Sequence, residues 1–140
     1  HKKDKKFINK IMKKIKNGDS ELFIVNDKNG TPTYTHDFAK NVKLLMENQY
    51  WGLYNMACGG QASRYEVAKE LINILSLNEE IKLTKVTSNY FSKEYFAPRP
   101  PSERLINKKL KLRNIDVMRD WKITLREYIE KYYSEYLISK

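Results

Sequence analysis

Four residue types are scarce in this 140-residue chain, which holds one cysteine, two histidines, five glycines and four prolines. The lone Cys58 excludes an internal disulfide and fits a reducing cytoplasm, where we expect the protein to act. No pair of His or Cys residues stands at the spacing of metal ligands. The glycines form neither a P-loop nor a Gly-x-Gly-x-x-Gly motif. The sequence therefore predicts neither a metal site nor a dinucleotide-binding loop within the chain.

Long hydrophobic runs are also missing, and the longest, such as residues 22–25, could not span a bilayer. The charged N-terminus lacks the apolar core of a signal peptide, and we expect no membrane partner. Acidic residues are the minority, with 17 Asp and Glu against 27 Lys and Arg, which gives a net charge of +10. Such a surface attracts anions. The early lysines and the cations of residues 108–113 favour a solvated basic surface, with phosphate binding as the alternative.

Apolar residues at helical spacing predict four helices. The first ends before Gly18, and the second starts near Thr35 or His36. The third and fourth open at capping boxes, Ser63-x-x-Glu66 and Thr124-x-x-Glu127. The residues expected on the buried sides are Phe7, Ile8, Ile11, Met12 and Ile15; Phe38, Val42 and Leu45; Val67, Leu71, Ile74 and Leu75; and Leu125, Tyr128, Ile129, Tyr132, Tyr136 and Leu137.

Short apolar runs between these helices predict strands. Residues 21–26 have the pattern of a strand buried on both faces, 51–57 of another strand, and 81–86 of a half-exposed one. Residues 27–30 are expected to form a turn, followed by a short extended segment at 31–35. Because helices and strands alternate along the chain, the predicted fold class is α/β.

Three conspicuous positions are better explained by structure than by chemistry. Cys58-Gly59-Gly60 lacks the third glycine of a phosphate-binding loop and indicates a strand-to-helix turn. Cys58 has no candidate base in the sequence, so we expect a buried, unreactive thiol. His36 stands alone beside Asp37 at a helix start, where we expect a structural role.

The long irregular stretch at residues 87–104 is the best candidate for a site. Arg99 lies between Pro98 and Pro100, whose restricted backbone angles would hold its guanidinium in one place. Arg104 follows closely, and an arginine fork matches two oxygens of a phosphate. The residues alone leave two interpretations open, an anion-binding loop and a structural corner.

A series of short motifs covers nearly the whole chain, and the ordered series is more specific than any of its members. The motifs are Phe7-Ile8-Asn9-Lys10-Ile11-Met12-Lys13-Lys14-Ile15, Val25-Asn26-Asp27, Gly30-Thr31-Pro32-Thr33-Tyr34-Thr35, Asp37-Phe38-Ala39, Gly52-Leu53-Tyr54-Asn55, Gly59-Gly60, Ser63-Arg64-Tyr65-Glu66, Ala97-Pro98-Arg99-Pro100-Pro101-Ser102, the run Leu105 to Leu110, and Asp120-Trp121. In this series the chain resembles the C-terminal half of the dTDP-4-dehydrorhamnose reductases, which are extended short-chain dehydrogenases/reductases.

The resemblance implies one substrate-binding portion, residues 1–140, with the last elements of a Rossmann fold and without its NAD(P)-binding half. Such reductases reduce the C4 ketone of dTDP-4-dehydro-L-rhamnose to give dTDP-L-rhamnose, a bacterial cell-surface sugar donor. The absent half would hold NADPH or NADH and the catalytic Tyr-x-x-x-Lys pair; Mg²⁺ is a further candidate cofactor of the parent enzyme. Tyr34 is not that tyrosine, because position 38 is Phe, and Tyr65-x-x-x-Lys69 falls outside the family's pair. We therefore expect the chain alone to be inactive.

The same resemblance implies a set of substrate-binding residues. The Arg-Pro-x-x-Ser pattern makes Arg99 the candidate for gripping the nucleotide diphosphate, with Ser102 and Arg104 nearby. Thr33 and Tyr34 lie in the segment that the superfamily runs past the sugar nucleotide. The implied partner is a dTDP-sugar and not a nucleic acid, and a homodimer is left open.

Three other interpretations remain. A regulatory homologue of these reductases, such as the methionine adenosyltransferase β-subunit, keeps the fold without a known reduction of its own. Epimerases and dehydratases of the same superfamily use similar C-terminal loops. A basic nucleic-acid-binding module would explain the charge of +10, but it would expose aromatic residues among basic ones, whereas we expect the aromatics on apolar faces.

Overall fold

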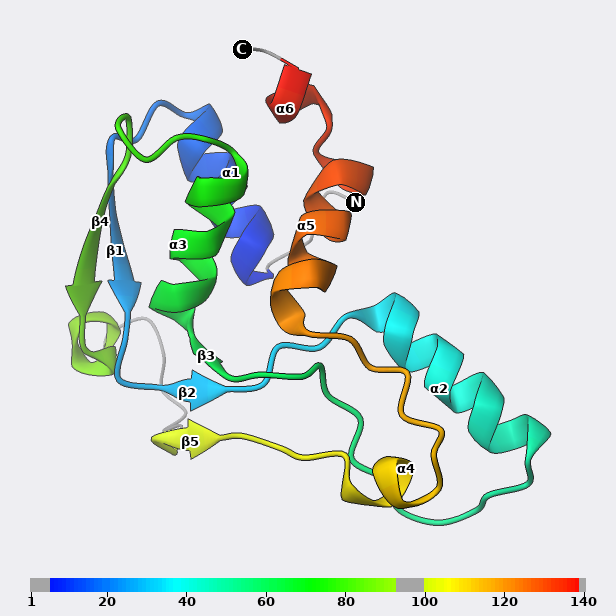
Figure 1. Ribbon diagram of the computed structural model, residues 1–140. Coiled ribbons are helices and arrows are strands. Elements are labelled where there is room, and N and C mark those ends of the chain that lie inside the picture. Colours follow the sequence, from blue (N-terminus) through cyan, green and yellow to red (C-terminus); the bar gives the residue numbers. More distant parts are fainter. Residues whose placement is uncertain (1–5, 93–99, 139–140) are drawn as a thin grey trace. The chain divides into compact units, whose positions relative to one another are not determined.

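The computed structural model describes residues 6–92 and 100–138, which form two compact units (Figure 1). Unit 1 comprises the described residues of His1–Asp27 and Ser63–Pro98, and unit 2 those of Lys28–Ala62 and Arg99–Lys140. Both units combine helices with short parallel strands, so the predicted α/β class is confirmed. Within the described residues, every helix is too short or too polar to cross a membrane.

Unit 1 is built on two parallel strands, β1 (Glu21–Val25) and β4 (Lys82–Val86), which pair in register from Glu21↔Lys82 to Val25↔Val86. Helix α3 (Arg64–Ile74) packs against both strands, and η1 (Ser88–Phe91) follows β4. The first strand is therefore confirmed, but its predicted burial on both faces is wrong at one position. Phe23 keeps 39% of its surface exposed and stacks on Tyr90, because alternate residues of a strand face opposite sides.

The two helices of unit 1 follow the sequence pattern closely. Helix α1 (Phe7–Lys16) buries Ile11 and Met12. At the start of α3, the Ser63 hydroxyl accepts a hydrogen bond from Glu66 N while the Glu66 carboxylate accepts one from Ser63 N, so the capping box is confirmed. The capping box pairs two backbone N–H groups that the start of α3 would otherwise leave without a partner.

Four helices end in the same hydrogen-bonded turn, in which the residue after the C-cap adopts a left-handed backbone. Glycine takes this position after α1, where Gly18 has a φ of 85° and the following amide bonds back to Lys14 O. The other three ends use non-glycine residues with φ between 53° and 55°: Gln49, Ser76 and Asn114. Scarcity of glycine therefore did not prevent these helix stops, but it removed their usual sequence signal.

A small sheet with the order β3-β2-β5 is formed by strands of two residues each, and β2, β5 and the first residue of β3 belong to unit 2. Strands β2 (Asn29–Gly30) and β5 (Ser102–Glu103) are parallel, and β3 (Ala62–Ser63) lies on the other side of β2. The turn predicted at residues 27–30 is wrong at its second half. Asn29 N donates to Pro101 O, a partner distant in sequence that local patterns could not show.

The helices of unit 2 are α2 (Thr35–Glu47), α4 (Lys108–Leu112), α5 (Trp121–Tyr132) and α6 (Glu135–Ile138). The predicted capping box at Thr124 is wrong, because α5 begins one turn earlier with Asp120 as its N-cap. The Asp120 carboxylate accepts a hydrogen bond from Lys122 N at 2.9 Å, and the buried Thr124 hydroxyl donates to Trp121 O inside the helix.

The strand predicted at residues 51–57 is also wrong, since this segment is an irregular loop. Trp51 and Leu53 keep 75% and 82% of their surfaces exposed, and Gly52 between them has a φ of 126°. Only glycine adopts that backbone angle without strain, and a residue with this angle interrupts an extended strand. Aromatic and aliphatic content alone therefore gave a misleading strand signal here.

Candidate functional site

An open pocket of about 400 Å³ lies in unit 2, at the carboxyl ends of two parallel strands. Strand β2 ends one residue before Thr31, and β5 ends one residue before Arg104. Carboxyl ends of parallel strands meet at one edge of a sheet, which is where α/β proteins place their ligands. The residues that line the pocket are Thr31, Gly60, Gln61, Arg104, Leu105 and Ile106.

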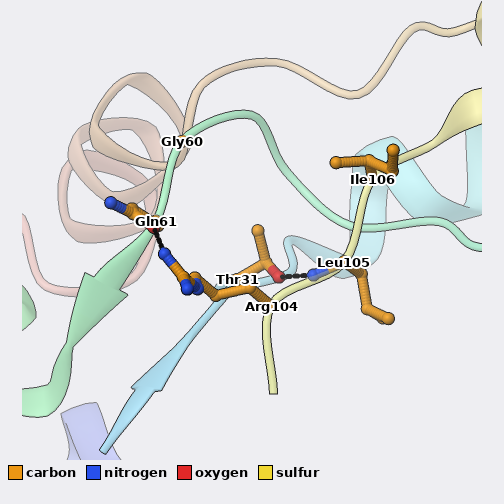
Figure 2. A pocket seen from close by; sticks show the side chains of 6 residues that line it. All are labelled: Thr31, Gly60, Gln61, Arg104, Leu105 and Ile106. Atoms are coloured by element: carbon orange, nitrogen blue, oxygen red, sulfur yellow. Dashed lines mark hydrogen bonds between the residues drawn. The ribbon is translucent and has the colours of Figure 1, made fainter. Parts of the chain in front are cut away.

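The guanidinium of Arg104 is held by two side chains, of which Figure 2 shows Gln61. Its Nε donates to the Ser102 hydroxyl at 2.9 Å, and its Nη1 donates to Gln61 Oε1 at 2.6 Å. These bonds fix the plane of the fork, so less rotamer entropy is lost when the remaining N–H groups bind an anion. An arginine aligned in this way suits two oxygens of a phosphate or diphosphate.

The rest of the lining is largely apolar. Leu105 N donates to the Thr31 hydroxyl at 2.8 Å, which joins the two strand ends across the pocket (Figure 2). Leu105 and Ile106 keep 48% and 69% of their surfaces exposed. The pocket therefore offers one fixed cation beside two aliphatic side chains, an arrangement that suits a ligand with an anionic group and an apolar face.

Gly60 is required by close packing beneath the pocket. Gly59 forms a parallel bridge with Asp120, and the backbone of Gly60 has a φ of 82°. A Cβ atom at Gly60 would lie 2.8 Å from Cδ1 of Trp121. The glycine pair thus lets the chain approach the start of α5, which gives it a structural role.

An ion-pair cluster in unit 2 is centred on the buried Asp37, with the partly exposed Arg119 and Glu127 around it. Asp37, fully buried on α2, accepts bonds from Arg119 Nη2 at 2.7 Å and Nε at 2.9 Å. Arg119 Nη1 also donates to Glu127 Oε2 at 2.6 Å. Burial alone would raise the pKa of Asp37, but the Arg119 hydrogen bonds and charge outweigh it and hold the pKa below its ordinary value. The Arg119 hydrogen bond likewise lowers the pKa of Glu127.

Tyr34 belongs to this cluster and not to the pocket lining. It is 7% exposed, and its hydroxyl donates to Glu127 Oε1 at 3.1 Å. Burial, reinforced by the hydrogen bond to Glu127, raises the pKa of Tyr34 to about 12. The phenol therefore stays protonated at neutral pH and serves as a donor to Glu127.

Comparison with known proteins identifies the family. Residues 1–134 match the family described as RmlD substrate binding domain. The chain belongs to this family. It is 32% identical over 120 residues to the spore coat polysaccharide biosynthesis protein SpsK of Bacillus subtilis (strain 168), covering 86% of this chain and 40% of that protein.

Solved structures related to this RmlD-type domain include three dTDP-4-dehydrorhamnose reductases. The enzyme from Clostridium acetobutylicum ATCC 824 is 31% identical, with a TM-score of 0.83 over 91% of this chain and 44% of that one. The enzyme from Yersinia enterocolitica (24% identity, TM-score 0.82, 98% of this chain and 45% of that one) shares the fold. The enzyme from Bacillus anthracis str. Ames, solved in complex with NADP, also shares the fold. It is 22% identical, with a TM-score of 0.79 over 91% of this chain and 44% of that one. The resemblance to these reductases is confirmed, and the chain spans less than half the length of these relatives.

The structure brings some of the sequence-predicted site residues of this RmlD-type domain together. Arg104 lines the pocket, and Ser102 accepts a hydrogen bond from the Arg104 guanidinium. Thr33 is exposed, and its hydroxyl donates a long hydrogen bond of 3.5 Å to Thr31 O. Tyr34 is buried away from the lining. Arg99, the first candidate, lies outside the described residues.

Sequence analysis missed Gln61 as a partner of Arg104, because a lone glutamine after two glycines has no distinctive pattern. Cys58 is buried, as expected, and its sulfur accepts a hydrogen bond from Tyr34 N at 3.3 Å. His36 Nε2 lies 2.8 Å from the Tyr132 hydroxyl, which fits the structural role expected for it. Among the described residues, no group of three or more His, Cys, Asp or Glu side chains could hold a metal ion.

Proposed function

We propose that this chain is the sugar-nucleotide-binding part of a dTDP-4-dehydrorhamnose reductase and binds a dTDP-sugar. The observation that carries the proposal is the family match over residues 1–134, supported by the 31% identity and TM-score of 0.83 with a reductase of that name. The parent protein would reduce the C4 ketone of dTDP-4-dehydro-L-rhamnose in the bacterial cytoplasm. Residues 1–140 would form one functional portion of it.

The proposed division of labour follows from what the chain can contribute. Hydride transfer needs NADPH or NADH, and a family relative has been solved with NADP. We assign cofactor binding and proton donation to a part of the parent protein beyond this chain. The described residues of this chain would bind and orient the sugar nucleotide.

Arg104 is the residue that we expect to contact the diphosphate. Its fork is aligned by Ser102 and Gln61, and two phosphate oxygens match its geometry. Arg99 is retained as a second diphosphate contact on the basis of its Pro-Arg-Pro setting. The exposed Thr33 hydroxyl is retained as a sugar contact, while Tyr34 would act indirectly by anchoring this segment to α5 through Glu127.

Calorimetric titration of dTDP-L-rhamnose into the chain and its Arg104→Ala variant tests this proposal. Loss of one charge-assisted phosphate contact, worth about 1.5–3 kcal/mol, should weaken binding roughly 10- to 100-fold. Arg126→Ala, which removes an exposed arginine from α5 in the same unit, is the matched control and should bind like the wild type. Equal affinity in the wild type and both variants would place the diphosphate away from Arg104. An absence of binding to the wild type at millimolar ligand would contradict the proposal.

A further inference from the structure

Two segments of unit 2, residues 48–56 and 105–114, lie side by side and form what we call the loop–α4 surface. The Lys109 ammonium donates to Leu53 O at 2.9 Å, and the Arg113 guanidinium lies 4.1 Å from the ring centroid of Tyr50. At the other end, Asn55 Nδ2 donates to Ile106 O at 3.4 Å. The contacts run the length of both segments, so the surface is a defined structure and not a loose loop.

This surface carries the most exposed large apolar side chains of the described residues. Leu53, Trp51, Leu112 and Ile106 keep 82%, 75%, 74% and 69% of their surfaces in water, and every other large apolar side chain described is less exposed. Single exposed apolar residues are ordinary, but the four highest values in two adjoining segments are not. Gly52, with a φ of 126°, sits between two of them and allows the turn that projects them.

The loop–α4 surface also carries positive charge that no acidic residue of the same two segments balances. Residues 48–56 and 105–114 contain four cations, Lys108, Lys109, Lys111 and Arg113, and no Asp or Glu. All four cations are exposed; Lys109 and Arg113 also contact rings of the loop, and Lys108 and Lys111 lie on α4. Apolar tips are thus bordered by positive charge, which selects an anionic partner.

The composition of the surface distinguishes among anionic partners. A second copy of the chain would bring four more cations to the contact and is disfavoured by repulsion. A single-stranded nucleic acid stacks successive bases on several aromatic faces, but two of the three aromatic residues in these segments, Tyr50 and Tyr54, already have a cation over the ring, which leaves Trp51 alone. Protein interfaces are depleted of lysine, whereas three of the four cations here are Lys. Trp and Leu tips with lysines around them are typical of segments that lie in the interface of a membrane.

We propose that the loop–α4 surface docks this chain reversibly on an anionic lipid bilayer, with Trp51 and Leu53 entering the headgroup region. The sequence predicted no membrane partner because it lacks a spanning segment, but interfacial docking needs none. The surface adjoins the sugar-nucleotide pocket, because Leu105 and Ile106 line both, but Arg104, the proposed diphosphate contact, lies outside the surface.

Flotation with vesicles of equal parts phosphatidylglycerol and phosphatidylcholine, compared with pure phosphatidylcholine, tests the proposal. The chain should bind only the anionic vesicles and should dissociate at high salt. Of the two tryptophans, Trp121 is 5% exposed, so a blue shift of emission on binding would report Trp51. Trp51→Phe should remove most of the shift and retain most of the binding.

Exposed substitutions then separate the two contributions without affecting the core. Lys108→Gln and Lys111→Gln should each weaken binding about fivefold, the effect of one cation near an anionic surface. Leu53→Ser with Leu112→Ser should weaken it about tenfold or more. Two matched controls should bind like the wild type: Ile123→Ser, an exposed apolar residue of α5, and Lys13→Gln with Lys16→Gln on α1.

Three results would overturn the proposal. The first is no binding to the anionic vesicles at low salt. The second is binding that survives the substitutions on the loop–α4 surface but is lost with the α1 lysines, which would assign it to the N-terminal basic helix. The third is preference for oligo(dT) over anionic vesicles together with quenching of Trp51, which would assign the surface to single-stranded nucleic acid.

Discussion

Replacing Arg119 by Met should destabilise unit 2, because it leaves the buried Asp37 carboxylate without its main cation. Removing one partner of a buried ion pair costs about 3–5 kcal/mol. Two features reduce that figure: the Arg119 side chain is itself 34% exposed, and Lys40 Nζ remains 3.8 Å from Asp37 Oδ1. We therefore expect a loss of about 2–3 kcal/mol at pH 7, with the methionine retaining most of the aliphatic packing.

The pH dependence has a definite sign in each protein. In the wild type the pKa of Asp37 is lowered, so its contribution is fully present above the unfolded pKa of about 3.9 and is lost as the pH falls through the folded pKa. In Arg119→Met, burial should dominate and raise the pKa of Asp37. The variant should therefore gain stability as the pH falls from 7 toward 4, and the difference between the two proteins should narrow.

Urea unfolding followed by tryptophan fluorescence measures this difference, since both Trp51 and Trp121 belong to unit 2. Arg126→Met is the matched control and should change stability by less than about 0.5 kcal/mol. A double-mutant cycle with Asp37→Asn should give a coupling of about 1 kcal/mol or more. A loss below about 1 kcal/mol at pH 7, or a difference that grows in acid, would refute the assigned role of the ion pair.

Two further predictions concern backbone positions. Gly60→Ala should lower the free energy of unfolding by about 2–4 kcal/mol, because it combines a left-handed backbone with a steric clash. Gly18→Ala, with no atom near its Cβ, should lower it by only about 1–2 kcal/mol. Equal losses of stability in thermal unfolding would argue against the clash at Gly60. Gln49→Gly and Ser76→Gly should each stabilise the protein by about 0.5–1 kcal/mol, because glycine removes the strain of the left-handed backbone. Asn114→Gly should stabilise it by less, because asparagine tolerates this backbone angle. A loss of stability in Gln49→Gly and Ser76→Gly would disprove strain at these positions.

Local sequence patterns sufficed where local interactions decide the structure. The capping box at Ser63 opens α3, the apolar stripe of α1 is buried at Ile11 and Met12, and the alternating run near residue 82 is strand β4. A capping box and a helical stripe each depend on residues within a few positions of one another. The family resemblance, which the match over residues 1–134 confirms, extended the prediction beyond these local signals.

The second helix shows where such patterns fail. Its apolar residues predicted the buried side, but the residues that α2 buries completely are Asp37 and Asn41, while Phe38 is 40% exposed. Asp37 is paired with Arg119, and Asn41 donates to Ile115 O while accepting from Val117 N. Polar burial of this kind depends on partners that lie far along the chain, and hydrophobic periodicity assigns such residues to the surface.

The candidate site combines both situations, which explains why only part of it was predicted. Arg104 could be chosen because guanidinium chemistry and a proline-rich setting are visible in one short segment. Its partner Gln61 follows a glycine pair more than forty positions earlier, and the two meet because β2 pairs with β5 and β3 lies on the other side of β2. Those strands have two residues each and carry almost no sequence signal. The register of the sheet therefore brings Gln61 to the arginine, so a substitution that shifts this register should weaken the proposed anion binding in the same way as loss of Gln61.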